Sequence, residues 1–431
     1  MLKKNINTIS FLTTGFFLVV LGIMLLIRKT FALTTLIVIV GLLLLIRGII
    51  DIFMNIISKK NKKAINIILA LLDIIFGIIC INNKNFILIS IARIAAVYFL
   101  FISITHLINY FLYIKYNIKG RLIVFIKFLV LFFLSLSLLI NPNINVKYLS
   151  IILGIYLILY GINSITNFLS EVIPPSSKNK FKRSINVQLP IILTAFIPKK
   201  LIGLINEMLE TDEDLSIFES IKKNKKSDLE VLIHLAPNGS AAMGHVEVSF
   251  KGKVYSYGNY DRHSRSLFDA IGDGVILIAD KEKYIKYCVE KKNRYIVEFG
   301  ISLTDKEKKI VEERIETLIN NNTIDYYCDM QLAEMGKIKM EEFHDMSSEI
   351  YKQASGKFKK ITSGKYKKFF VLKNNCVMVA QYILSSVGKE VLAINGLISP
   401  GAYYEYLNKR FNMKNTNIIS RKIYSKKNIK G

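Results

Sequence analysis

Two side chains in the C-terminal half of the sequence are of types that could perform nucleophilic chemistry together. Cys376 follows Asn374 and Asn375 and begins an apolar run with helical spacing, CVMVAQYIL. Asparagine favours the start of a helix, so this thiol is expected at the positive end of a helix dipole, where a reactive thiolate is stabilised. His245 stands in a segment of alternating apolar and polar residues and could supply a general base from a strand. The corresponding chemistry is attack of a thiolate on an amide or ester carbonyl.

The elements that must position this pair are typical of an α+β domain. Alternating and short apolar runs predict a strand at 228–236, a hairpin over 244–258 and further strands at 274–279 and 295–300. Two helices follow from capping signals. The first begins at Thr304, which has capping-box spacing to Glu307, and runs to about residue 319; the second runs from Cys376 to just before residue 388.

The register of the hairpin decides which residue could hold the imidazole in its useful tautomer. If the hairpin closes symmetrically about residues 251–252, Glu247 and Ser256 share the face of His245. A one-residue bulge would bring Tyr257 to that face instead. Ser256 and Tyr257 therefore both stay candidates for the third residue of the site.

The order of these pieces resembles the permuted members of the papain-like NlpC superfamily, which include the lecithin:retinol acyltransferase-like proteins. The resemblance covers residues 229–410. It is carried by Gly244-His245 with the following VEVSF, by the strand VYSYGNYD, and by Asn375-Cys376 with VMVAQYIL.

This resemblance implies a permuted papain-like domain with the nucleophile at Cys376 and the base at His245. A residue of the second strand, Ser256 or Tyr257, would be the third catalytic residue. The implied activity is that of a thiol hydrolase (peptidase or amidase) or an acyltransferase. The second strand holds no unambiguous Glu, Asp or His, so a catalytically inactive copy of the domain stays open.

The other cysteines and histidines favour structural roles. A cysteine that opens an amphipathic helix is often a packing residue, and that alternative stays open for Cys376 as well. We expect Cys288, Cys328 and His234 in the core and His263 and His344 on the surface, with His263 able to approach a substrate. Four cysteines without a CxxC pair indicate neither a zinc site nor a disulfide framework, and they fit a reducing compartment. No nucleotide-binding motif is present, so no cofactor is expected.

The composition indicates a membrane protein. Hydrophobic residues make up 52% of the 431 residues, and the mean hydropathy is +0.35. Six apolar segments are each long enough to cross a bilayer as a helix, which needs about 20 residues. They are residues 9–27, 31–57, 64–81, 86–114, 122–140 and 148–169. The formal net charge of +26 indicates contact with anionic lipid, and no nucleic-acid partner is expected, because the lysines are spread over the chain.

Positive charge predicts the orientation of these segments. The loops after the second, fourth and sixth segments are richer in Lys and Arg than the loops between them, for example Lys59, Lys60, Lys62 and Lys63 after the second. By the positive-inside rule, both termini and the C-terminal domain lie in the cytoplasm, with the helices in the plasma membrane.

A repeat is visible in the apolar region. GLLLLIRGIIDIFMN, from Gly41, aligns with GIYLILYGINSITNF, from Gly154, and AVYFLFISITHLINY is a weaker copy. Gly48, Ser103 and Gly161 occupy one repeated position, where a small residue lets helices approach closely. The repeat resembles the HdeD-like acid-resistance membrane family over about the first 170 residues. The resemblance implies an all-α six-helix bundle of three hairpins.

Charged residues inside the apolar segments need partners, because an unpaired charge is costly in hydrocarbon. We expect Asp73 to pair with Arg93, and Arg47 to pair with Asp51. The segments offer no chain of carboxylates for a proton or ion relay, so transport is a weak hypothesis.

Four parts of the chain are predicted. They are a membrane domain at 1–172, a linker at 173–228 with an interfacial amphipathic helix at 189–210, the papain-like domain at 229–410 and a loosely ordered basic tail at 411–431. The favoured function is hydrolysis or acyl transfer on an amide or ester at the cytoplasmic membrane face. The partners would be the lipid bilayer and a membrane-proximal peptide, lipid or acylated substrate. The alternative is a non-catalytic, stress-related membrane protein with a degenerate papain-like binding or sensor domain.

Overall fold

The computed structural model describes residues 2–57, 64–172, 201–203, 220–221, 226–235, 244–387, 399–413 and 416–426. The chain folds as two compact units. The first comprises Met1–Ile108 and Leu122–Phe168, and the second comprises Asn109–Arg121 and Leu169–Gly431. Each unit is described by itself.

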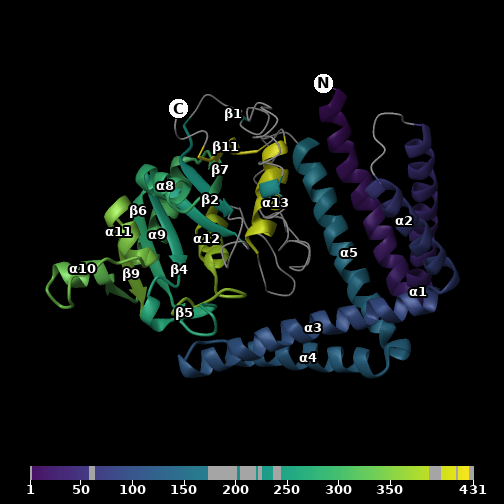
Figure 1. Ribbon diagram of the computed structural model, residues 1–431, viewed down its shortest axis with the longest axis horizontal. Helices are drawn as coiled ribbons and strands as arrows, with labels where there is room; N and C mark the ends of the chain where they lie inside the picture. Colours follow the sequence, from purple (N-terminus) through teal and green to yellow (C-terminus); the bar gives the residue numbers. More distant parts are fainter. Residues whose placement is uncertain are drawn as a thin grey trace. The chain divides into compact units, whose positions relative to one another are not determined.

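The first unit is helical and strongly apolar (Figure 1). Its helices are α1 (Leu2–Ile57), α2 (Ala64–Asn82), α3 (Lys84–Lys115), α4 (Arg121–Ile140) and α5 (Pro142–Val172). Four helices of the described chain are long and apolar enough to cross a membrane by length and composition: those at Ile9–Asn55, Lys84–Lys115, Arg121–Ile140 and Pro142–Leu169. Large apolar side chains are exposed along them, which suits contact with lipid. The protein is therefore a membrane protein; the count of six spans stays a prediction.

Glycines bring neighbouring helices into close contact. A Cβ at Gly48 in α1 would lie 2.7 Å from the Ala70 carbonyl oxygen of α2. A Cβ at Gly161 in α5 would lie 2.7 Å from the Gly15 carbonyl oxygen of α1. Both distances are too short for a side chain, so the close approach expected at these repeated positions is confirmed. The third position differs, because the buried Ser103 donates its hydroxyl to a carbonyl of its own helix.

One predicted ion pair is present and the other is replaced. Arg47 Nε lies 3.5 Å from Asp51 Oδ2 and 3.6 Å from Asp73 Oδ2. Among the described residues, Asp73 thus pairs with Arg47 of α1, and the expected partner Arg93 is exposed on α3. The reason is that α1 and α2 pack tightly along the Gly48 contact, which brings the two charges together.

The second unit contains an antiparallel sheet with the order β1-β11-β7-β2-β3-β4-β6-β9-β8. The strands are β1 (Ser220–Ile221), β2 (Leu229–Leu235), β3 (His245–Phe250), β4 (Lys253–Gly258), β6 (Val275–Asp280), β7 (Tyr295–Ile301), β8 (Thr323–Tyr326), β9 (Lys357–Ile361) and β11 (Ile418–Tyr424). A separate pair joins β5 (Ile271–Asp273) to β10 (Lys368–Phe370). The predicted strands at 228–236, 244–258, 274–279 and 295–300 are all confirmed as β2, β3 with β4, β6 and β7.

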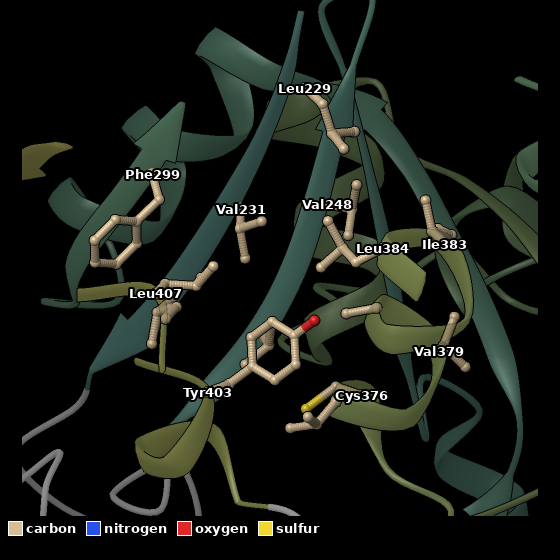
Figure 2. Close-up of a cluster of buried hydrophobic side chains, with 14 of the residues drawn as sticks. Leu229, Val231, Val248, Phe299, Cys376, Val379, Ile383, Leu384, Tyr403 and Leu407 are labelled. Atoms are coloured by element: carbon tan, nitrogen blue, oxygen red, sulfur yellow. The ribbon is translucent and has the colours of Figure 1, made fainter. Parts of the chain in front are cut away.

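Helices cover both faces of this sheet (Figure 1). They are α8 (Lys281–Glu290), α9 (Asp305–Asn320), α10 (Asp329–Glu334), α11 (Met346–Ala354), α12 (Cys376–Leu384) and α13 (Pro400–Asn412), with the short η4 (Arg262–Ser264) and η5 (Ser385–Val387). The core on one face joins α9, α12 and α13 to the sheet, and the core on the other joins α8 and α11. Figure 2 shows the first core, in which Val248 of β3, Cys376 and Val379 of α12 and Tyr403 of α13 lie together.

The two helix starts predicted from capping residues are confirmed. Thr304 and Glu307 form a capping box that begins α9, and Asn375 caps α12.

The prediction of a loosely ordered tail at 411–431 is wrong for residues 418–424. These residues form β11, which pairs with β7 and β1 and so satisfies its backbone hydrogen bonds within the sheet.

The predicted linker lies largely outside the described residues. Of the interfacial helix expected at 189–210, the structure describes residues 201–203, which are helical. Leu201 and Ile202 are buried in the core of the second unit.

The glycine contact predicts a stability effect. Replacement of Gly48 by Leu should lower the free energy of unfolding by about 1–3 kcal/mol, because an oversized side chain must push α2 away from α1. The measurement is thermal unfolding of the full chain in detergent. Ile50→Leu is the matched control, since Ile50 is 52% exposed on the same helix and should leave the melting temperature unchanged. Equal melting of both variants would contradict the contact.

Candidate functional site

Cys376 is the first residue of α12. Asn375 caps the helix, and its side-chain oxygen accepts the Met378 N–H at 3.4 Å. The first N–H groups of a helix have no partner within the helix, so those of Cys376 and Val377 point out from the helix start. Cys376 is 5% exposed and packs in the core between the sheet and α12. The sequence-predicted placement of this thiol is confirmed.

His245 begins β3 and faces two polar partners through one ring nitrogen. Its Nε2 lies 2.8 Å from Ser256 Oγ and 3.4 Å from Glu247 Oε1. Burial opposes a charge on the ring, but the interaction with Cys376 and the hydrogen bond and charge of Glu247 outweigh it and raise the pKa of His245 to about 10. The Cys376 thiol is thus one of the groups that favour the charged form of the ring.

The buried carboxylate of Glu247 lies next to His245. The Glu247 side chain is fully buried, and one of its oxygens accepts the Tyr284 hydroxyl at 2.7 Å. The other lies 2.8 Å from His234 Nε2. Burial disfavours the charged carboxylate, but His234 and His245 outweigh that cost and hold the pKa of Glu247 well below its usual range. Burial lowers the pKa of His234 despite the carboxylate beside it, so the charge shared with Glu247 sits on His245.

Ser256 links His245 to a second layer of hydrogen bonds. Its hydroxyl lies 2.7 Å from the Tyr260 hydroxyl, and both residues are buried. The Tyr260 carbonyl in turn accepts the Ser347 hydroxyl of α11 at 2.6 Å. Burial, with the charge of Glu247, raises the pKa of Tyr260, so this phenol stays protonated and can donate to Ser256. Ser256 can then accept from Tyr260 and also interact with the imidazole.

The register of the β3–β4 hairpin decides whether Ser256 or Tyr257 could be the third residue of the site. Ser249 pairs with Val254 and Phe250 with Lys253, as symmetric closure about residues 251–252 requires. Ser256 therefore lies beside His245. Tyr257 packs in the core that contains Cys376, and its hydroxyl donates to the Tyr366 carbonyl at 2.8 Å. The structure thus brings together three of the four sequence-predicted site residues and directs the Tyr257 hydroxyl elsewhere.

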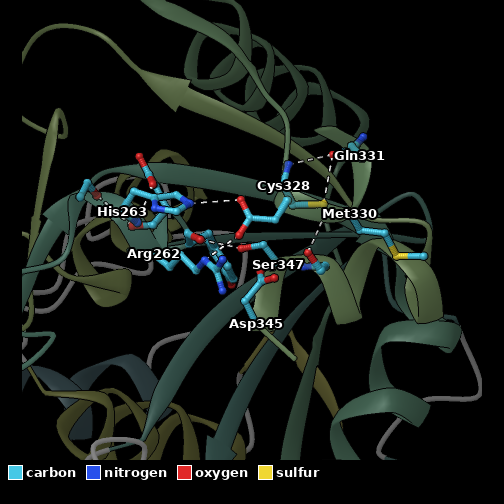
Figure 3. A network of polar contacts seen from close by, with 12 residues as sticks. Arg262, His263, Cys328, Met330, Gln331, Asp345 and Ser347 are labelled. Carbon is cyan, nitrogen blue, oxygen red and sulfur yellow. Dashed lines mark hydrogen bonds and ion pairs between the residues drawn. The ribbon is translucent and has the colours of Figure 1, made fainter. Parts of the chain in front are cut away.

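The remaining cysteines and histidines have structural surroundings. Burial raises the pKa of Cys288 to about 12, and it also raises that of Cys328. Figure 3 shows Cys328 in a polar network with Arg262 and His263. There the largely buried Asp329 carboxylate lies 2.6 Å from Arg262 Nε and 3.2 Å from His263 Nε2. His344 is exposed, as expected, and lies in a loop.

All four cysteines are free. Within the described ranges, no cluster of three or more His, Cys, Asp or Glu side chains could hold a metal ion.

Glu247, Tyr284 and Tyr260 are the site residues whose roles sequence reasoning missed. Strand alternation did place Glu247 on the face of His245, but its partners come from β2 and α8. A histidine in the apolar run of β2 was a signal that a buried charge lies nearby, because a core histidine needs a polar partner.

Comparison with known proteins identifies the class of the N-terminal region. Residues 13–82, 68–139 and 129–175 match the family described as a short repeat of unknown function (DUF308). Three overlapping matches agree with the internal repeat and with the apolar helices, so this part is a repeat-built membrane region similar to that family. No curated protein and no solved structure matches the chain.

The Glu247 contacts predict a change in thiol reactivity. In Glu247→Gln, His245 loses a charged partner, so its pKa falls from about 10 and transfer of the proton from the Cys376 thiol to the ring becomes less favourable. Alkylation of Cys376 by iodoacetamide should slow about tenfold, since a hydrogen bond to a charged group contributes about 1.5–3 kcal/mol. Alkylation is measured by mass spectrometry of the Cys376 peptide.

The matched control is Glu312→Gln. Glu312 pairs with Lys251 at the exposed end of the hairpin, so its loss should leave alkylation unchanged. Alkylation of Glu247→Gln at the wild-type rate would show that the carboxylate does not hold the imidazolium.

Proposed function

We propose that the α+β domain is a permuted papain-like cysteine hydrolase or acyltransferase. The observation that carries the proposal is that Ser256 and Glu247 approach Nε2 of the His245 ring, while Cys376, at the start of α12, favours the charged form of that ring. This is the order of groups that nucleophilic thiol catalysis needs: a nucleophile, a base and residues that orient the base.

The proposed reaction begins with the Cys376 thiolate and the His245 imidazolium. The sulfur attacks the carbonyl carbon of an amide or ester, and the N–H groups of Cys376 and Val377 stabilise the oxyanion. His245 gives its proton to the leaving nitrogen or oxygen, and the C–N or C–O bond breaks to leave a thioester. Neutral His245 then takes a proton from water or from an acceptor that attacks the thioester, and the thiolate leaves. The product is an acid or a transferred acyl group.

Glu247 and Ser256 are positioning residues in this proposal. Their contacts with Nε2 orient the ring, and the buried negative charge of Glu247 stabilises the imidazolium. Tyr257 packs beside α12 and acts through the shape of the site.

The membrane region restricts the substrates. We propose that it forms six spans, with the kink at Lys29 of α1 separating the first two, and that both termini and the α+β domain face the cytoplasm from the plasma membrane. The basic loops and the four free cysteines support this orientation. Lipid esters, acylated proteins and membrane-proximal peptides then fit better than extracellular polymers.

The alternative is a non-catalytic sensor or binding domain. One observation favours it: Cys376 is only 5% exposed, so substrate access to the sulfur requires local movement.

Thiol-directed labelling distinguishes the two functions. A thiolate paired with imidazolium should react with a fluorescent iodoacetamide at pH 7 on the order of tenfold faster than an ordinary thiol, which is only a few per cent ionised. We expect fast labelling of the full chain in detergent, its loss in Cys376→Ser and its slowing in His245→Asn. Cys328→Ser is the control and should label like the wild type, because burial raises the pKa of the Cys328 thiol. Labelling of Cys376→Ser at the wild-type rate would exclude a reactive thiol at this position.

A further inference from the structure

The loop between η4 and β5 presents two apolar side chains to the outside. Leu267 is 53% exposed, and Phe268 is 102% exposed. The loop is closed at its base by Ser266 and Ile271, whose backbone N–H and carbonyl groups exchange hydrogen bonds of 2.9 and 3.2 Å. Ala270 N–H also donates to the Leu267 carbonyl at 3.1 Å, so the tip is a tight, ordered turn.

The backbone of this tip adopts a conformation that its residues disfavour. Leu267, Phe268 and Asp269 have φ values of 51°, 54° and 62°, in the left-handed region that bulky residues rarely adopt. The Asn259 side-chain amide holds the tip by donating to the Asp269 carbonyl at 2.6 Å. Arg265 Nη1 lies 3.7 Å from Asp269 Oδ2 on the same loop. The fold thus maintains an exposed aromatic residue at a conformational cost, which indicates a purpose other than packing.

The loop is connected directly to the segment that carries the candidate nucleophile. The Ala270 carbonyl accepts the Val371 N–H at 3.0 Å, and Ile271 of β5 pairs with Phe370 of β10. Phe370 N–H then donates to the Asn374 carbonyl, two residues before Cys376. The tip and the start of α12 are therefore parts of one hydrogen-bonded structure.

The strand facing this loop belongs to a strongly basic segment. Residues 357–373 contain seven lysines and no Asp or Glu. Acidic residues from other segments offset part of this charge: Lys359 pairs with Asp325, Lys360 with Asp261 and Asp273, and Lys368 with Asp273. Lys365 is exposed at the turn before β10. An exposed aromatic tip beside excess positive charge is complementary to a surface that is anionic outside and apolar beneath, which describes a bilayer with acidic lipids.

We propose that Leu267 and Phe268 insert into an anionic lipid bilayer and hold the rim of the Cys376 site at the membrane surface. The chain itself ensures that a bilayer is near, because its N-terminal unit contains membrane-spanning helices. A second step rests on the proposed function: the substrate would be an acyl compound embedded in the same leaflet, reached without leaving the membrane.

The absence of tryptophan from the chain allows a direct test. Phe268→Trp places a single fluorophore at the tip of the full chain, reconstituted in vesicles of brominated phosphatidylcholine and phosphatidylglycerol. Bromine quenches tryptophan only within the hydrocarbon region, so we expect a blue-shifted emission and strong quenching. Ile324→Trp is the matched control, since Ile324 is a 55% exposed apolar residue of the edge strand β8 and should stay unquenched. Equal emission and quenching at both positions would overturn the proposal.

A second variant tests the insertion without relying on position 268 as the probe. Leu267→Trp should be quenched in the same vesicles, and the added substitution Phe268→Asp should remove the quenching. Quenching that persists in the double variant would overturn the role of the tip. The same measurements in Cys376→Ser should be unchanged, because insertion does not require the thiol. Failure of the proposed catalysis and failure of the proposed insertion into the bilayer would therefore be seen as separate results.

Discussion

The arrangement around His245 in the α+β domain depends on a buried negative charge, the carboxylate of Glu247. A buried charge is costly unless it is paired and hydrogen-bonded, so the fold must bring partners to it. His234 from β2, Tyr284 from α8 and His245 from β3 supply those partners at 2.8, 2.7 and 3.4 Å. The requirement fixes β2 beside β3 and places α8 over the same face. It also orients the His245 ring. The same contact therefore pairs the buried charge and positions the proposed base.

The predictable parts of this domain are those encoded by neighbouring residues. The turn at Lys251 and Gly252, with φ values of 52° and 75°, set the hairpin register and so placed Ser256 beside His245. Asn375 likewise capped the helix that Cys376 begins. The role of Glu247 could not be predicted, because Tyr284 lies 37 residues away in the sequence. Strand β11 was missed for a similar reason: its pairing with β7 depends on distant chain segments, and its basic residues favour a solvated tail.

In the membrane unit, too, features encoded by neighbouring residues could be predicted, whereas contacts between distant segments could not. Small residues at a repeated position indicate that some helix approaches closely, and Gly48 and Gly161 confirm it. They do not identify which helix approaches, because every neighbour in the bundle is equally apolar. Asp73 illustrates the consequence. Depth in the bilayer made Arg93 a reasonable partner, yet the packing of α1 on α2 gives Asp73 the guanidinium of Arg47.

The exposures of the two central side chains constrain how any substrate reaches the proposed site. The His245 ring is 22% exposed, whereas Cys376 is 5% exposed, so the accessible edge of the pair is the imidazole. In the proposed reaction, a carbonyl group would approach past His245, and movement of the segment that contains Cys376 would have to expose the sulfur. That segment is tied to β10, and through Phe370 and Ile271 to the exposed loop at Phe268. A surface that binds the loop at Phe268 would therefore act, through β5 and β10, on the segment that precedes Cys376.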